Sequence, residues 1–390
     1  MKPSSAITTL ILVAVVVVIC VWATYANNGG NNPEPPYSDD ITGEWNVVRT
    51  ETGSFSGDST VYTTSAETGI ATIKKVEDGF YSFTFMGETT TFVRGDNVLL
   101  GTGSHNSVHT IISIKGDTLN LIYTTEADPV DVNVIRFDRT VPNDTNLPDQ
   151  TESGLPDVDE SMKAYRVLRY TAEKGVEDHT YAGNTMTVVG KAGPFTYTEE
   201  KYVEDGQEYV LKYVCVNIRD NIYIAAGMYE TLYTLGMMYV QNGNVYNTTF
   251  SGSGTKEIWM TAFGDKSKEE PVLDLKGRHY AGTETTYITS GGTAKKVESD
   301  VTMKVSEQID RDVIINTETD GGPAIWCGNI SKSGSEYLLN VQSYALFEGE
   351  IYSGYYICLL SKDLKTLKVF GCLCGENGSG AVFKQVLSLQ

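Results

Sequence analysis

The apolar and polar positions divide the chain into one long apolar run and a remainder with a period of two. The run covers residues 6–23 and carries no charge. As a helix it would be about 27 Å long, close to the hydrocarbon thickness of a bilayer. Lys2 precedes it, and the next basic residue is Arg49. Because positive charge stays on the inner side, residues 1–26 are predicted to be a single-pass transmembrane anchor that contacts membrane lipid through residues 6–23, with the N-terminus cytoplasmic and the rest extracytoplasmic.

A cleavable signal sequence is the alternative interpretation of this run. The segment is followed by Thr24-Tyr25-Ala26, which matches a signal-peptide cleavage site approximately. Cleavage there would leave a secreted protein. The apolar stretch is longer than the apolar core of about 7–15 residues in a typical signal. This favours an uncleaved anchor, and both alternatives place the remainder outside the membrane.

Beyond residue 40 the pattern predicts strands. Tyr81, Phe83 and Phe85 alternate with polar or less bulky neighbours, and residues 209–215 repeat this alternation. Val, Ile, Thr and Tyr are abundant, and Gly, Asn and Asp interrupt the pattern every 8–12 residues or so, as expected of strands joined by turns. We therefore expect an all-β protein of antiparallel strands, as barrels or as sandwiches.

Low-apolar stretches divide the strands into three modules of similar length. The predicted organisation is a linker at 27–40, β module 1 at 41–140, an acidic linker at 141–161, β module 2 at 162–265, a linker at 266–274 and β module 3 at 275–390.

The three modules resemble copies of one plan. Each is predicted to carry a late hairpin and then a closing strand. The hairpins are expected at residues 111–123, 237–250 and 356–372, and the closing strands at 132–137, 257–263 and 380–386. Val-Glu-Asp-Gly occurs at 76–79 and again at 203–206, and in each case a turn that begins with arginine and contains Asp-Asn follows about fifteen residues later, at 94–97 and 219–221.

The first module resembles the calycin or lipocalin-like family. Gly43-Glu44-Trp45 opens it, and residues 134–139 close it with two arginines. In that family a basic residue of the last strand covers the indole of the opening Gly-x-Trp, so the resemblance implies that Arg136 or Arg139 covers Trp45. It also implies a barrel with an apolar interior, whose ligand-binding residues would be Trp45, Phe83, Phe85 and Arg136. The second and third modules open with tyrosine instead of tryptophan.

Charge and cysteine content narrow the class of protein. A formal net charge of −20 repels nucleic acid and anionic lipid headgroups, so no nucleic-acid partner is expected. The six cysteines are too few for a disulfide-built scaffold. Cys358 lies on the strand opposite Cys372 and Cys374 in the third hairpin, which leaves one disulfide possible if the register allows it.

No sequence motif points to catalysis. His105 and His109 would lie about 13 Å apart on a strand, too far to share a zinc ion. No nucleophile elbow, P-loop or dinucleotide motif is present, so we expect no metal, no cofactor and no enzyme activity. A hydrolase with an unrecognised pair of carboxylates is the enzymatic alternative.

Two further signals suit a surface protein. Sequons make Asn143, Asn247, Asn329 and Asn377 candidates for glycosylation. Twelve of the 24 tyrosines lie between Tyr165 and Tyr246. The predicted function is a membrane-anchored cell-surface protein with a non-catalytic binding or structural role, whose partner is a glycan, a small apolar ligand or another surface protein.

Overall fold

The computed structural model describes residues 40–390 with internal gaps. The gaps are residues 66–67, 96–97, 103–106, 126–129, 141–160, 172, 181–182, 205, 220, 230–231, 252–256, 291–292, 320–321, 334–335, 348–349 and 376–379. Within the described residues, no helix is long and apolar enough to cross a bilayer. The predicted anchor at residues 1–26 lies outside them.

The first module is a closed antiparallel barrel, which decides between barrel and sandwich. Its sheet runs β2-β1-β3-β4-β5-β6-β7-β8-β9 and closes through pairing of β1 with β9. The strands are β1 (Gly43–Ser56), β2 (Ser59–Ser65), β3 (Ile70–Glu77), β4 (Phe80–Phe85), β5 (Glu88–Arg94), β6 (Val98–Gly101), β7 (Ser107–Lys115), β8 (Thr118–Thr125) and β9 (Asp131–Asp138).

The second module repeats this barrel with the same strand order. Its sheet runs β11-β10-β12 and on to β18, and it closes through pairing of β10 with β18. The strands are β10 (Ser161–Thr171), β11 (Gly175–Asp178), β12 (Thr185–Ala192), β13 (Phe195–Glu204), β14 (Gln207–Arg219), β15 (Ile222–Tyr229), β16 (Leu232–Gln241), β17 (Asn244–Ser251) and β18 (Glu257–Phe263).

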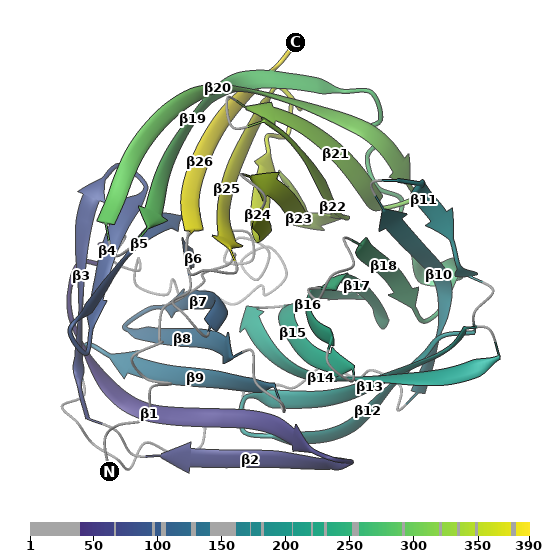
Figure 1. Cartoon of the computed structure of the whole chain (residues 1–390), viewed down its shortest axis with the longest axis horizontal. Coiled ribbons are helices and arrows are strands. Elements are labelled where there is room, and N and C mark those ends of the chain that lie inside the picture. The colour runs from purple at the N-terminus through teal and green to yellow at the C-terminus, as the bar shows by residue number, and fades with distance from the viewer. Residues whose placement is uncertain are drawn as a thin grey trace, which may run out of the picture.

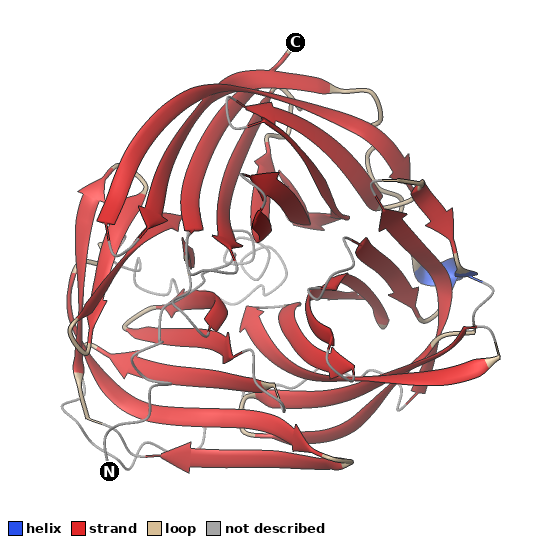
Figure 2. Cartoon of the chain, in the orientation of Figure 1, coloured by secondary structure: helices blue, strands red, loops and turns tan. Residues whose placement is uncertain are grey.

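The third module is a barrel of eight strands in simple sequence order. A short 3-10 helix, η2 (Lys266–Lys268), precedes it in the connection from the second barrel (Figure 2). The strands are β19 (His279–Ser290), β20 (Thr293–Ile309), β21 (Asp312–Thr319), β22 (Gly322–Ser333), β23 (Glu336–Phe347), β24 (Glu350–Leu360), β25 (Thr366–Gly375) and β26 (Gly380–Leu389).

The strands that pair with the opening strand of each barrel, on the side away from its closing strand, show that the modules share one plan. In the third barrel the single long strand β20 pairs along the whole of β19. In the first barrel, β2 and β3 pair with opposite ends of β1, and β11 and β12 divide β10 in the same way. A register shift skips Val76, Val189 and Ser306, in each case shortly before the turn to the next strand. The predicted repeat of a barrel module is therefore confirmed.

The sequence repeat is only partly equivalent in structure. The late hairpins are β7–β8, β16–β17 and β24–β25, and the closing strands are β9, β18 and β26, at equivalent positions. The two Val-Glu-Asp-Gly segments are not equivalent. The first ends β3 and begins the turn to β4, whereas the second joins β13 to β14, one hairpin further round its barrel. The distance in sequence from Val-Glu-Asp-Gly to the following arginine is similar in the two modules because β4 and β5 together cover about as many residues as β14 alone.

The three barrels surround a common centre, and each touches the other two (Figure 1). Strands β1 and β9 contact β14, β5 and β6 contact β25 and β26, and β17 and β18 contact β22 and β23. One buried apolar cluster contains the interior of the first barrel together with outward-facing residues of the other two, such as Val214 and Phe370. At Gly53 a Cβ atom would lie 2.6 Å from the Phe195 ring of the second barrel, so this approach requires glycine.

Candidate functional site

The predicted ligand-binding phenylalanines of the first barrel pack against one another. The ring of Phe83 lies 6.4 Å from that of Phe85 and 5.9 Å from each of Phe92 and Phe137, and Phe85 lies 5.2 Å from Phe137. All four side chains are buried. Edge-to-face contacts of this kind stabilise a core, so this part of the interior is filled by rings. A ligand role for Phe83 and Phe85 stays a prediction.

An arginine covers the indole of Trp45, as the resemblance implied, and it is Arg139. Its guanidinium carbon lies 4.1 Å from the ring centroid. Arg139 Nη2 donates to the carbonyl oxygens of Asp40 at 2.9 Å and Thr42 at 3.0 Å. Arg136 instead lies opposite Arg49 in the β1–β9 register. The ligand-binding role predicted for Trp45 and Arg136 is untested by this geometry.

Replacing Arg139 with alanine should lower the free energy of unfolding by about 1–2 kcal/mol, because it removes a cation–π contact and two hydrogen bonds to main-chain carbonyls. Urea unfolding measures the change. Lys74→Ala, an exposed change on β3, is the control and should cost less than about 0.5 kcal/mol. An equal loss of stability in the two variants would show that the contacts of Arg139 do not stabilise the barrel.

Two of the four glycosylation candidates are buried. The Asn247 side chain is 2% exposed and faces the interior of the second barrel beside Met238 and Thr261. Asn329 is also 2% exposed, and its Nδ2 donates to Thr248 Oγ1 at 2.8 Å. Both side chains are buried in the folded chain, and glycosylation at these two positions stays a prediction. Asn143 and Asn377 lie outside the described residues.

The possible disulfide is not formed, and the β24–β25 register gives the reason. Cys358 lies opposite Val369, whereas Cys372 lies opposite Tyr355 and Cys374 opposite Ser353. Because neighbouring positions alternate between the two faces of a sheet, Cys358 points into the barrel, and Cys372 and Cys374 point out of it. None of the three buried thiols is in a disulfide, and burial raises the pKa of Cys358 and Cys372.

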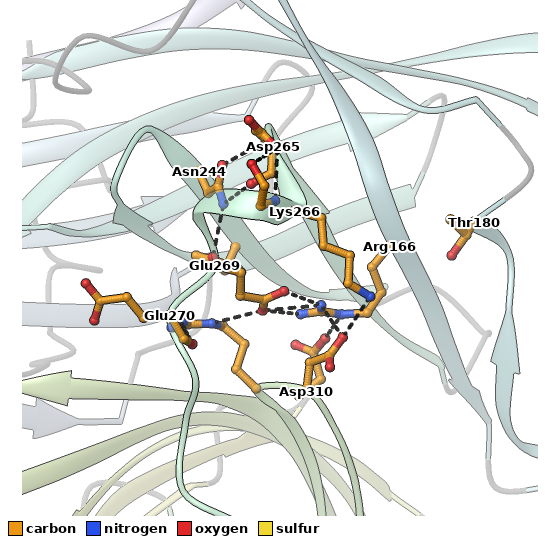
Figure 3. Close-up of polar contacts among 12 residues, drawn as sticks. Arg166, Thr180, Asn244, Asp265, Lys266, Glu269, Glu270 and Asp310 are labelled. Atoms are coloured by element: carbon orange, nitrogen blue, oxygen red, sulfur yellow. Dashed lines mark hydrogen bonds and ion pairs between the residues drawn. The ribbon is translucent and has the colours of Figure 1, made fainter.

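A buried network of charges joins the second and third barrels. Arg166 of β10 reaches across the junction, where its Nε is 2.5 Å from Asp312 Oδ2. Its Nη1 is 3.1 Å from both Glu269 Oε2 and Asp310 Oδ2 (Figure 3). Burial opposes the charge on Arg166, but attraction to Asp312 and Glu269 outweighs this effect and raises its pKa.

Arg311 completes this network from the turn between β20 and β21. It is 1% exposed, its Nε lies 3.2 Å from Glu269 Oε1, and its guanidinium carbon lies 4.3 Å from the centroid of the Tyr246 ring. Its Nη2 donates to the carbonyl oxygen of Glu270 at 3.1 Å. The connection that carries Glu269 and Glu270, predicted to be a linker, is thereby held to both barrels. We interpret this network as structural.

The interior of the second barrel contains a deeply buried carboxyl group. It contains Glu200 of β13, which is 5% exposed and lies opposite Met186 and Leu211, both interior residues. Asn184 Nδ2 donates to Glu200 Oε1 at 3.1 Å. Burial raises the pKa of Glu200 to about 7, although the hydrogen bond from Asn184 lowers it.

Further polar groups share this interior. Asn184 Oδ1 and Asn247 Oδ1 are buried without a hydrogen-bond partner. Cys215 Sγ lies 3.6 Å from Thr198 Oγ1 and 3.8 Å from Met238 Sδ. Burial raises the pKa of Cys215 to about 12, so this thiol is not a nucleophile at neutral pH. Because buried polar atoms normally have partners, two unpaired amide oxygens in the barrel that also contains Glu200 mark it as a candidate site.

Comparisons with known proteins leave the family of this chain open. No family model and no curated protein matches it. Among solved structures, transferrin binding protein B from serogroup B Neisseria meningitidis is 10% identical, covers 90% of this chain and 77% of its own, and has a TM-score of 0.24. A protein of unknown function from Nostoc punctiforme, of the DUF3598 family, is 10% identical, covers 59% of this chain and 95% of its own, and also has a TM-score of 0.24. Likenesses of this size carry no conclusion about function.

Proposed function

We propose that this chain is an extracytoplasmic, non-catalytic binding protein that holds a small ligand inside its second barrel. The observation that carries this proposal is the presence of buried polar atoms without partners in that barrel, one of which, Asn184 Oδ1, belongs to the side chain that donates to the buried carboxyl of Glu200. A site that binds a polar ligand leaves such atoms unpaired when the ligand is absent. In the third barrel Trp326 Nε1 and Gln385 Oε1 are also buried without a partner, but the carboxyl beside Gln385, that of Glu284, is only half-buried.

The location follows from the sequence. The uncharged run at residues 6–23, with the basic residue before it, supports an anchor that leaves the barrels outside the membrane. The high negative charge, which suits a soluble exported surface, agrees with this location.

Protease added to intact cells is expected to digest the chain beyond residue 26, with a cytosolic protein as the control that survives until the cells are broken. Immunoblotting with an antibody against the third barrel gives the measurement. A chain that is protected in intact cells and digested only after lysis would contradict the proposed location.

The binding function has a separate test. Isothermal titration calorimetry of the purified full chain against a set of small aromatic amines, alcohols and carboxylates should show saturable binding of at least one class. If none binds, the second barrel is no ligand site, and a purely structural role replaces the proposed function.

A further inference from the structure

The second barrel differs from its neighbours in what fills it. The first interior is packed by the phenylalanine rings described above. In the third, Trp326 stacks on Tyr356 with ring centroids 4.3 Å apart, and Phe383 lies 5.1 Å from Tyr356. The second contains three methionines, two tyrosines, valine, alanine and one phenylalanine, with threonine and asparagine side chains around Glu200. Methionine side chains are flexible and adapt their packing to different neighbours, which suits a variable occupant.

The unpaired groups near Glu200 specify the charge of that occupant. Asn184 uses its Nδ2 on the Glu200 carboxyl, which leaves Asn184 Oδ1 as a buried acceptor without a donor. Asn247 Oδ1, on the far side of the same interior, is a second such acceptor. Carboxylate and amide oxygens only accept hydrogen bonds, so the Glu200 carboxyl and these two amide oxygens favour an occupant that donates hydrogen bonds and carries positive charge.

Aromatic rings continue the inner face of the same hairpin towards its end. Tyr202 and Tyr209 pair directly across β13 and β14, and their rings stack with centroids 5.1 Å apart. Both are half-buried, and each lies two residues beyond an interior position, Glu200 and Leu211 respectively. Because alternate residues share a face, the two tyrosines extend the interior lining to the turn between the strands. Tyrosine faces attract cations.

We propose that the second barrel binds a small molecule with a protonated amine on an aromatic or apolar body, with Glu200 as its counter-ion. The ammonium group would donate to Glu200 and Asn184 Oδ1, and the body would pack among the methionines. This inference rests on the proposed function and adds the chemical class of the ligand to it.

The test compares 2-phenylethylamine with 2-phenylethanol, which has the same body without the charge, by isothermal titration calorimetry on the full chain. The amine is expected to bind at least tenfold more tightly than the alcohol at pH 8, because a charge-assisted hydrogen bond contributes about 1.5–3 kcal/mol. Glu200→Gln should remove this preference. Glu199→Gln is the matched control, since Glu199 precedes Glu200 on β13 and faces out of the barrel beside Lys212.

The pH dependence gives a readout that needs no variant. Among the side chains that the structure describes, the other titratable groups on the inner faces of β13 to β15 are the phenols of Tyr202, Tyr209, Tyr213 and Tyr223 and the thiol of Cys215. On β12 the residue opposite Glu200 is Met186, which does not titrate. Their ordinary pKa values are about 8.5 or higher. Amine binding at pH 6 should therefore release a proton from Glu200, which calorimetry in buffers of different ionisation enthalpy detects.

The results of these titrations either support or overturn the proposed class of ligand. Amine preference that is lost in Glu200→Gln and kept in Glu199→Gln supports the proposal, as does proton release at pH 6. Equal binding of amine and alcohol, or an unchanged preference in Glu200→Gln, overturns it while leaving the binding function intact. Binding of neither compound, together with no change in the Glu200 carboxyl signal in ¹³C NMR, overturns the proposal.

Discussion

Replacing Arg166 with alanine is expected to lower the free energy of unfolding by about 3–5 kcal/mol at neutral pH, the range for removing one member of a buried ion pair. The change leaves Asp312 buried at 5% exposure without its closest cation. Burial already raises the pKa of Asp312, although Arg166 lowers it. Without Arg166 this carboxyl can avoid its charge by taking up a proton, so the loss of stability should be smaller in acid.

Urea unfolding at pH 7 and pH 4 measures this effect. Lys174→Ala is the control, because Lys174 Nζ lies 3.3 Å from Glu177 Oε1 in an ion pair near the surface, and such pairs contribute about 0–1 kcal/mol. A loss for Arg166→Ala no greater than for Lys174→Ala would show that the junction network does not hold the barrels together. Arg166→Ala combined with Asp312→Ala should recover part of the stability, since no buried charge is then left unpaired.

Glutamine at position 200 is expected to raise the free energy of unfolding by about 3 kcal/mol at pH 8. The pKa of Glu200 rises from its ordinary value of 4.5 to about 7 in the folded chain, chiefly through burial. The folded state therefore holds this proton more tightly than the unfolded state. The stability that the proton contributes is complete below pH 4.5 and is lost as the pH rises through about 7.

Glutamine carries no charge at any pH, keeps an oxygen to accept from Asn184 Nδ2 and offers a donor to Asn184 Oδ1. The gain over wild type should therefore be large at pH 8 and close to zero at pH 4, and chemical unfolding at both values measures it. Glu199→Gln, on the outer face of β13, should show no such dependence. A gain for Glu200→Gln that is the same at both pH values would mean that this carboxyl does not titrate near neutrality in the folded chain.

These two variants concern residues that sequence reasoning did not single out. Glu200 lies in the stretch Thr-Glu-Glu-Lys-Tyr, which resembles a solvated strand. A signal was present, because the alternation at residues 209–215 marks one face of the partner strand as interior. Once strand pairing is known, Glu200 falls on that face. The pairing itself depends on turn and register, and sequence pattern alone does not determine it.

The barrel strands were predictable where both turn chemistry and alternation were clear. The hairpin at β16–β17 turns through Asn242 and Gly243, both with positive φ, as a tight turn between antiparallel strands requires. The packing of barrel on barrel was not predicted. Its signal lies in short runs that are apolar on both faces, such as residues 214–216, where Cys215 faces the interior and Val214 and Val216 face another barrel. Two-sided burial produces such runs in any sheet covered on both sides.

The triangular arrangement of contacts has a consequence for how the molecule fails. The three barrels make three pairwise contacts. While two of these contacts are intact, the two surfaces of the third contact stay close together at a high effective concentration, so this contact re-forms without a diffusional search. Loss of a single contact is therefore readily reversed while the other two hold the barrels together. Opening the assembly requires that two contacts be broken at the same time.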